Sequence, residues 1–212
     1  TLRHAIDLAP GHISAYALTV EDGTALARRV AKGEVTPCDA DLAAEMYDRT
    51  GDLLEAAGYR QYELSNWALP GHESRHNSAY WTDGEYVGIG AGAHGYVAGE
   101  RFENIAHPRP YIAAFDAPAA AGARPGVAAR YTPDRTTAMF DYLTMRLRLV
   151  EGFPAHDFEA KFGVSLTEAA GPPLSECVAA GVLELGDQVR LTRAGRLLHS
   201  EVMARVLAYL RR

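Results

Sequence analysis

The pattern of apolar and polar positions predicts a strand, a helix and a second strand in the first third of the chain. Residues His12–Val20 are apolar on both faces, as in a parallel strand covered by helices, whereas Gln61–Trp67 alternates apolar and polar side chains. Between them, residues 39–58 carry apolar side chains at helical spacing and predict a helix. Its apolar face consists of Leu42, Met46, Leu53, Leu54 and Ala57. We therefore predict a βαβ unit with a right-handed crossover.

A further strand is predicted over Tyr86–Ala91, and it leads into a glycine-rich turn. Residues 90–95 match the pattern G-x-G-x-x-G, which must open a helix in a dinucleotide-binding fold. The next residues, Tyr96–Phe102, instead predict a hairpin that turns at Ala98-Gly99. The glycines therefore indicate a close approach of the backbone to a neighbouring strand or to a ligand.

The chain changes character after its middle. Residues 115–129 are mostly Ala, Pro and Gly, and they predict a linker or a long loop. This segment separates a first region, residues 1–114, from a C-terminal domain, residues 130–212. Strands and helices in the first region, followed by a mainly helical second region, predict an α/β protein.

The C-terminal domain carries clear local signals. Thr132-Pro133-Asp134 predicts the start of a helix that Gly152 ends, and Thr192 is expected to cap the last helix. Val182–Leu185 and Val189–Leu191 are separated by turn residues and predict a small hairpin. Helices followed by a two-stranded wing indicate a winged-helix-like domain.

Composition and charge exclude several classes of protein. The 212 residues are 48% apolar, which is enough for a packed core, and no apolar run approaches the roughly 20 residues of a membrane span. The sequence starts without Met or a leader-like segment, so we expect a soluble, cytoplasmic fragment. The net charge of −6 argues against general affinity for nucleic acid.

The C-terminal domain also lacks the charge of a DNA-binding module. Residues 174–212 contain six Arg and four acidic residues, a surplus of two positive charges. This surplus is small for a surface that neutralises phosphates. We therefore predict that the winged-helix-like domain is a cap that packs against the first region.

Candidate chemistry is concentrated between Glu63 and Trp81. His72-Glu73-Ser74-Arg75-His76 matches H-E-x-x-H, which binds zinc in hydrolases when both histidines project from one face of a helix. Pro70-Gly71 directly before this run disfavours such a helix. A third ligand is not evident, although His94 and His107 remain possible. A zinc hydrolase is therefore a lesser alternative.

The same stretch carries a family resemblance. Residues 76–81, His-Asn-Ser-Ala-Tyr-Trp, resemble the H-N-x-x-Y-W signature of the haem chaperone branch of the oxygen-independent coproporphyrinogen III oxidase-like proteins, members of the radical SAM superfamily. Other segments resemble the family in the same order along the chain. They are His12–Leu18 with Glu21, Tyr62–Asn66, Gly88–His94, Arg101 with Asn104, and Leu149–Gly152.

The resemblance implies a fold and a function. The fold would be the C-terminal part of a radical SAM (β/α) partial barrel, followed by the helical winged-helix-like domain. The function would be that of a haem chaperone, which binds haem and passes it to an acceptor protein. The related coproporphyrinogen oxidases imply an alternative, the oxidative decarboxylation of a porphyrinogen by a SAM-derived radical.

The resemblance also implies a haem site around His76. Haem iron needs an axial donor, which imidazole commonly supplies, and aromatic side chains cover the porphyrin face. We expect His76 to ligate the iron, Tyr80 and Trp81 to form the walls, and Arg75 or Arg101 to pair with the propionates.

Two neighbours of His76 have different expected roles. Asn77 could hydrogen-bond the backbone and fix the turn. His72, four residues before His76, is the competing candidate for the iron ligand.

A SAM site and an iron–sulfur cluster are implied for the intact protein. By position in the family pattern, Thr19 and His94 would offer backbone contacts to the adenine of SAM. Family clusters of the 4Fe–4S type are held by a C-x₃-C-x₂-C loop, to which neither Cys38 nor Cys177 belongs. This chain alone is therefore predicted to hold no cluster and to be inactive in SAM cleavage.

Overall fold

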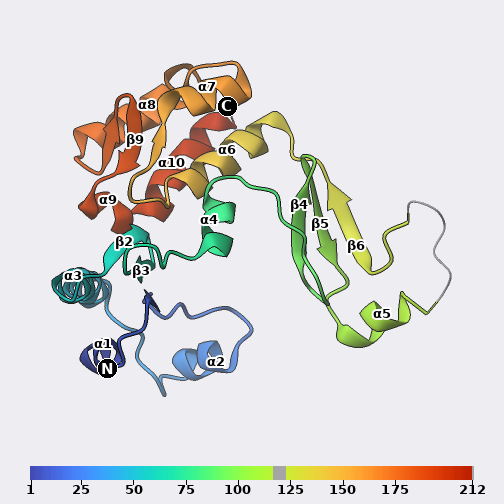
Figure 1. Cartoon of the computed structure of the whole chain (residues 1–212), viewed down its shortest axis with the longest axis horizontal. Coiled ribbons are helices and arrows are strands. Elements are labelled where there is room, and N and C mark those ends of the chain that lie inside the picture. The colour runs from blue at the N-terminus through green and yellow to red at the C-terminus, as the bar shows by residue number, and fades with distance from the viewer. Residues whose placement is uncertain (117–122, 212) are drawn as a thin grey trace. The chain divides into compact units, whose positions relative to one another are not determined.

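A computed structural model describes residues 1–116 and 123–211, and the chain divides into two units between Ser74 and Arg75 (Figure 1). Residues 117–122 fall inside the predicted linker, so that prediction lies partly outside the described residues. The rest of the predicted linker contains a strand, β6 (Val127–Tyr131). The domain boundaries near residues 114 and 130 remain predictions.

The first unit, residues 1–74, combines three helices with a three-stranded sheet in the order β1-β3-β2. Both outer strands run antiparallel to β3. The elements are α1 (Leu2–Asp7), β1 (His12–Ser14), α2 (Ala25–Ala31), α3 (Ala40–Ala56), β2 (Arg60–Glu63) and β3 (Asn66–Ala68).

This sheet corrects three sequence predictions. The segment Gln61–Trp67 is not one strand, because the chain turns at Leu64-Ser65 and returns as β3. Strand β3 lies between β1 and β2, so these two are not parallel neighbours as the βαβ prediction required. The strand predicted over His12–Val20 ends at Ser14, since only its first residues pair with β3.

Helix α3 fulfils the prediction for residues 39–58, and the Asp39 carboxylate caps it by accepting from the amides of Asp41 and Leu42. Its predicted apolar face is only partly buried. Leu54 is fully buried, whereas Leu42 and Met46 are exposed. The small core of the unit consists of Ile13, Leu54, Tyr59 and Trp67.

The second unit begins with a short helix and an antiparallel sheet in the order β4-β5-β6. The predicted hairpin is confirmed: β4 and β5 are joined by Ala98 and Gly99, which both have positive φ as a tight hairpin turn requires. The strand predicted over Tyr86–Ala91 is wrong, because only Tyr86 forms a bridge, to Tyr96. The elements are α4 (Arg75–Trp81), β4 (His94–Val97), β5 (Glu100–Asn104), α5 (Pro108–Ala113) and β6.

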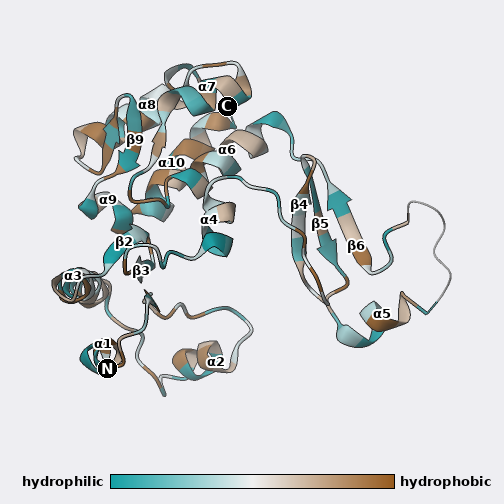
Figure 2. Cartoon of the chain, in the orientation of Figure 1, coloured by the Kyte–Doolittle hydropathy of each residue, from teal (hydrophilic) through white to brown (hydrophobic). Residues whose placement is uncertain are grey.

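The remainder of the second unit is mainly helical, with a third antiparallel sheet in the order β7-β9-β8. Apolar residues, brown in Figure 2, recur along α8 and α10, and Leu174, Val202 and Val206 of these helices are buried. The elements are α6 (Arg135–Arg146), β7 (Phe153–Pro154), α7 (Ala155–Phe162), α8 (Leu166–Ala179), β8 (Leu183–Leu185), β9 (Gln188–Leu191), α9 (Arg193–Leu197) and α10 (His199–Leu210).

Most local predictions for this part are confirmed. Asp134 caps α6, and β8 and β9 form the predicted hairpin. Thr192 caps α9 rather than the last helix, because the predicted last helix is divided into α9, which ends at Leu197, and α10, which begins at His199. Gly152 does not end α6, which stops at Arg146. It lies instead where a Cβ atom would come within 2.0 Å of the Val189 carbonyl oxygen, so only glycine lets the chain pass β9.

The mixed α/β class and the helical C-terminal part are therefore confirmed, while the parallel pairing is not. All ladders between strands of the described residues are antiparallel. No described helix combines the length and the hydropathy needed to cross a membrane.

Candidate functional site

His76 lies on α4, one residue after the helix begins, and its side chain is exposed. Its Nε2 atom makes a hydrogen bond of 2.8 Å with the hydroxyl of Tyr80. The two residues are four apart, so they lie on the same face of the helix. Their rings also meet edge to face, with centroids 4.9 Å apart. The predicted ligand and one predicted wall are therefore in direct contact.

Tyr80 packs further onto Tyr86, which follows α4. The two rings meet edge to face at 4.4 Å. Tyr86 is held by its bridge to Tyr96 on β4, so the hairpin supports the aromatic cluster beside His76. Burial raises the pKa of the Tyr86 phenol, and the positive charge of Arg101 opposes the rise. Tyr86 is not among the site residues predicted from the sequence. The only signal in the sequence is that this aromatic residue follows Tyr80 closely.

Trp81, the second predicted wall, is engaged elsewhere in the unit. The Arg148 guanidinium lies over its ring, 4.3 Å from the centroid, and helix α4 packs on α6. The indole nitrogen of Trp81 is buried and has no hydrogen-bond partner among the described residues. Just after the helix, Asp83 pairs with Lys161 of α7. These contacts hold the end of α4 against α6 and α7, and Trp81 contributes to them through its contact with Arg148.

The two candidate cations differ in their surroundings. Arg101 pairs with Asp141 of α6 at 2.9 Å and lies over the ring of Tyr96. Burial raises the pKa of Asp141, and Arg101 acts against this rise. Arg75 is exposed at the first position of α4, beside His76. Arg75 is therefore the better-placed cation for an anionic group near His76.

The H-E-x-x-H alternative fails on geometry. His72 precedes α4 and His76 lies within it, so one helix does not present both imidazoles. His72 packs against Gly11, where a Cβ atom would lie 2.4 Å from Nδ1 of His72. Of the open third ligands, His94 is exposed at the start of β4 and His107 caps α5. Among the described residues, no group of three His, Cys, Asp or Glu side chains could hold a metal ion.

Glu63 and Asn66, at the turn between β2 and β3, form a buried network. Glu63 is fully buried, and its Oε1 accepts from the amide of Ser65 at 2.7 Å and from Nδ2 of Asn66 at 2.5 Å. The hydroxyl of Ser14 on β1 donates to Oδ1 of Asn66. The network stabilises the turn between β2 and β3 and links it to β1. These contacts favour the position of β3 in the middle of the sheet.

The glycine-rich turn is held by side chains from β5 and α5. Asn104 is buried, and its amide donates to the carbonyls of Gly88 and Gly90 at 3.2 and 2.9 Å. The amide of Gly90 donates to the Tyr111 hydroxyl at 3.3 Å. At Gly88, a Cβ atom would come within 2.1 Å of the His94 carbonyl oxygen. Gly88 thus lets the backbone pass β4 closely. Of the glycines in the predicted turn, Gly95 lies close to a neighbouring strand, since a Cβ atom there would lie 2.1 Å from the Phe102 ring of β5, whereas a Cβ atom at Gly90 would meet no described atom within 4 Å.

The remaining predicted residues lie on different segments of the two units. Thr19 is exposed beyond the end of β1 in the first unit, whereas His94 is exposed in the second unit. Asn77 lies on α4 and is partly buried. Cys38 is exposed, while Cys177 is buried in α8, where burial raises the pKa of its thiol. Two such separate thiols do not fit the three-thiolate loop of a 4Fe–4S cluster.

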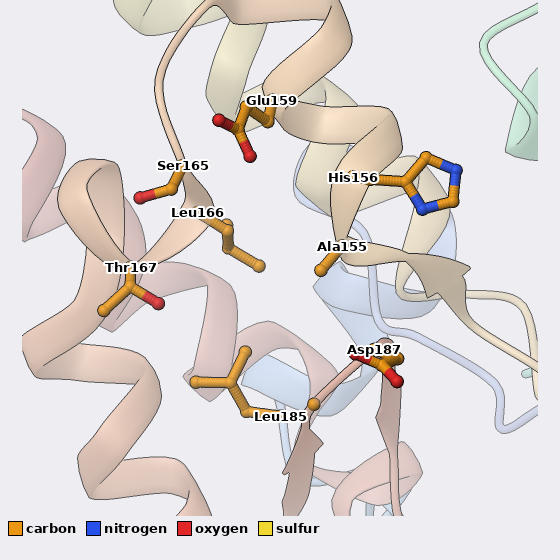
Figure 3. A pocket seen from close by; sticks show the side chains of 9 residues that line it. Ala155, His156, Glu159, Ser165, Leu166, Thr167, Leu185 and Asp187 are labelled. Carbon is orange, nitrogen blue, oxygen red and sulfur yellow. The ribbon is translucent and has the colours of Figure 1, made fainter.

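A cavity of about 510 Å³ lies apart from α4 in the second unit. Figure 3 shows that its walls come from α7, the start of α8 and the turn between β8 and β9. None of the predicted haem or SAM residues lines it. The lining residues are Ala155, His156, Glu159, Ser165, Leu166, Thr167, Leu185, Gly186 and Asp187.

Comparisons with known proteins bear on this arrangement. Residues 134–198 match the family described as HemN C-terminal domain. The heme chaperone HemW of Mycobacterium tuberculosis is 39% identical over 207 residues, which cover 96% of this chain and 49% of that protein. The heme chaperone HemW of Escherichia coli is 34% identical over 218 residues, covering 98% of this chain and 52% of that protein. The resemblance expected from the sequence motifs is confirmed.

A solved structure shares the fold. Coproporphyrinogen III oxidase HemN from Escherichia coli, described as a radical SAM enzyme, matches with a TM-score of 0.73 at 14% sequence identity. The match covers 99% of this chain and 51% of that one. At this identity the likeness shows the fold alone. The chain spans about half the length of the curated relatives it matches.

Proposed function

We propose, from the premise that this chain is a relative of the heme chaperones HemW, that it forms part of a haem chaperone. Its role would be to bind haem and to pass it to an acceptor protein. The observation that carries this proposal is the exposed imidazole of His76 on α4, beside the ring of Tyr80. Haem supplies an iron that takes an axial nitrogen donor and a flat apolar face that aromatic side chains cover.

The residues around His76 fit these needs. A porphyrin is broad, so its ligand must be accessible, and His76 is exposed while the tyrosine beside it is held by Tyr86. Arg75 supplies a positive charge next to the imidazole, where a propionate could pair with it. Asn77 lies on the same helix and would help to fix its start. Trp81 contributes by anchoring α4 through Arg148.

Haem is the cargo of this site, and SAM and a 4Fe–4S cluster belong to our proposal only for the longer protein. The thiols of this chain do not fit a cluster. Thr19 and His94 stay candidates for backbone contacts to SAM. The acceptor is an unidentified protein. We propose no nucleic-acid partner, on the basis of the net charge of −6, and we also propose a cytoplasmic location.

A second candidate is an oxygen-independent coproporphyrinogen III oxidase in the intact protein. The shared fold with HemN favours it, since the two structures superpose along nearly the whole chain. The H-N-x-x-Y-W run at residues 76–81 and the HemW relatives favour the chaperone. Turnover of coproporphyrinogen by the full-length protein, measured under anaerobic conditions, would decide for the oxidase.

The ligand assignment is tested by haem titration of two matched variants. His76→Ala should weaken haem binding at least tenfold, equivalent to about 1.4 kcal/mol, and shift the Soret band, because the axial donor is lost. His72→Ala is the matched control, since it removes an imidazole four residues earlier, outside α4, and should have the smaller effect. If His76→Ala binds haem as the wild type does, the assignment is wrong.

A further inference from the structure

The atom of His76 that is best suited to bind iron is already in use. The hydroxyl of Tyr80 contacts Nε2 at 2.8 Å. If the hydroxyl donates, it occupies the nitrogen lone pair that iron would need. If Nε2 carries the proton and donates to the hydroxyl, that lone pair is absent from Nε2 altogether. In either tautomer, the hydrogen bond must break before Nε2 can ligate iron.

The other ring nitrogen is a poor substitute. Nδ1 is bonded to Cγ, the ring atom that carries the side chain's link to the backbone. A porphyrin extends several ångströms around its iron, so a macrocycle centred on Nδ1 would run into α4, on which His76 sits. Nε2 points away from the backbone and is the nitrogen that a macrocycle can approach.

The position of the Tyr80 hydroxyl is fixed by packing. The Tyr80 ring meets Tyr86 edge to face at 4.4 Å and meets the His76 ring at 4.9 Å. The helix spacing of four residues holds the hydroxyl on the face of α4 that carries His76. The contact is therefore built into the helix and its supporting cluster, and a Phe at position 80 would keep the ring contacts while losing the hydroxyl.

We infer that Tyr80 is a positioning residue that competes with haem iron for Nε2 of His76 and so weakens haem binding. This inference rests on the proposed function, because it requires His76 to be the ligand. The hydroxyl satisfies the imidazole whenever haem is absent, and haem must displace it. A cargo protein benefits from such a competitor, since the bound and released states come closer in free energy and transfer becomes easier.

The test is a haem titration of Tyr80→Phe followed at the Soret maximum. Removing the competitor should tighten the dissociation constant about fivefold, in line with the net worth of one hydrogen bond. The Soret position at saturation should match that of the wild type, because the ligand is unchanged. Haem transfer to excess apomyoglobin, used as a general haem sink, should leave a larger fraction of haem on the variant at equilibrium.

A double-mutant cycle separates this inference from the proposed function. In the His76→Ala background, Tyr80→Phe should change haem affinity by less than twofold, since no imidazole remains for the hydroxyl to contact. Tyr131→Phe, which removes an exposed hydroxyl from β6, is the matched control and should leave the affinity unchanged.

Three results would overturn the inference. Unchanged or weaker haem binding by Tyr80→Phe, with His76→Ala still impaired, would refute the competition and leave the ligand assignment standing. A shifted Soret band in Tyr80→Phe would mean that the phenol itself contacts the iron. Normal binding by His76→Ala would refute the proposed function, and the inference would fall with it.

Discussion

The first unit and the helical part of the second unit, residues 135–210, differ in how completely they bury their apolar side chains. In the second unit, large residues such as Phe153, Phe158 and Leu174 are fully buried among α6, α7, α8 and α10. In the first unit, Tyr16 and Leu18 remain 78% and 80% exposed, although the sequence predicted a strand with two covered faces there. A similar apolar pattern thus leads to a dense core in one unit and to open surface in the other.

The difference shows that a hydrophobic pattern indicates which side chains favour burial. Whether they are buried depends on other elements that pack against them. The second unit supplies helices around its sheet β7-β9-β8, so each inward side chain finds neighbours. The first unit has three short strands and one small core around Trp67 and Leu54. Nothing in that unit covers Leu18 among the described residues, and its strand ends at Ser14. The comparison can be tested through stability.

The largest expected effect comes from the dense core of the second unit. Phe158 packs on Tyr142 and Phe162, with ring centroids 5.8 and 4.7 Å away. Phe158→Ala should lower the free energy of unfolding by roughly 3–5 kcal/mol, because it leaves a cavity that the packed rings cannot fill. Urea unfolding followed by circular dichroism measures this loss. Val178→Ala, at a 41% exposed site on α8, is the control and should cost far less.

A smaller effect should appear in the pH dependence of the same unit. His199 is buried, its Nε2 contacts the Thr144 carbonyl at 3.0 Å, and burial lowers the pKa of the imidazole from its ordinary 6.5. The charge of nearby Arg148 also lowers it, while the Thr144 contact raises it. Because the unfolded state then takes up the proton first, stability should fall as the pH drops below about 6.5.

The control for this effect is His199→Gln, which keeps a donor for the Thr144 carbonyl but does not titrate over this range. Urea midpoints of both proteins between pH 7.5 and pH 5.5 should diverge, with the wild type losing more. Parallel loss in the two proteins would show that His199 is not the group responsible.

The smallest effect is expected at the open surface of the first unit. Leu18→Ser should change the free energy of unfolding by less than about 0.5 kcal/mol, since the side chain is mostly in water already. The urea midpoint of this variant should match the wild type. A loss above about 1 kcal/mol would mean that Leu18 packs in solution, and the contrast between the units would then be weaker than the structure indicates.

The sequence by itself determined the features that depend on near neighbours. Thr192 caps a helix that begins where predicted, and Asp134 caps α6 at the predicted helix start, because such a cap is a contact between residues three apart. The hairpin at Ala98-Gly99 also depends on neighbouring residues, since these two residues adopt the positive φ angles that a two-residue turn requires. The family motif at residues 76–81 lies on α4, a helix that the sequence pattern did not predict.

Only the tertiary structure decided the contacts between distant segments. It placed β3 between β1 and β2, and the buried carboxylate of Glu63 stabilises the turn between β2 and β3. The alternating pattern of residues 61–67 gave no sign of this turn. It set Trp81 against Arg148, 67 positions further along the chain, a contact that spacing along the sequence does not predict. Such contacts depend on which surfaces meet after folding, and periodicity along the chain carries information only about which face of an element is apolar.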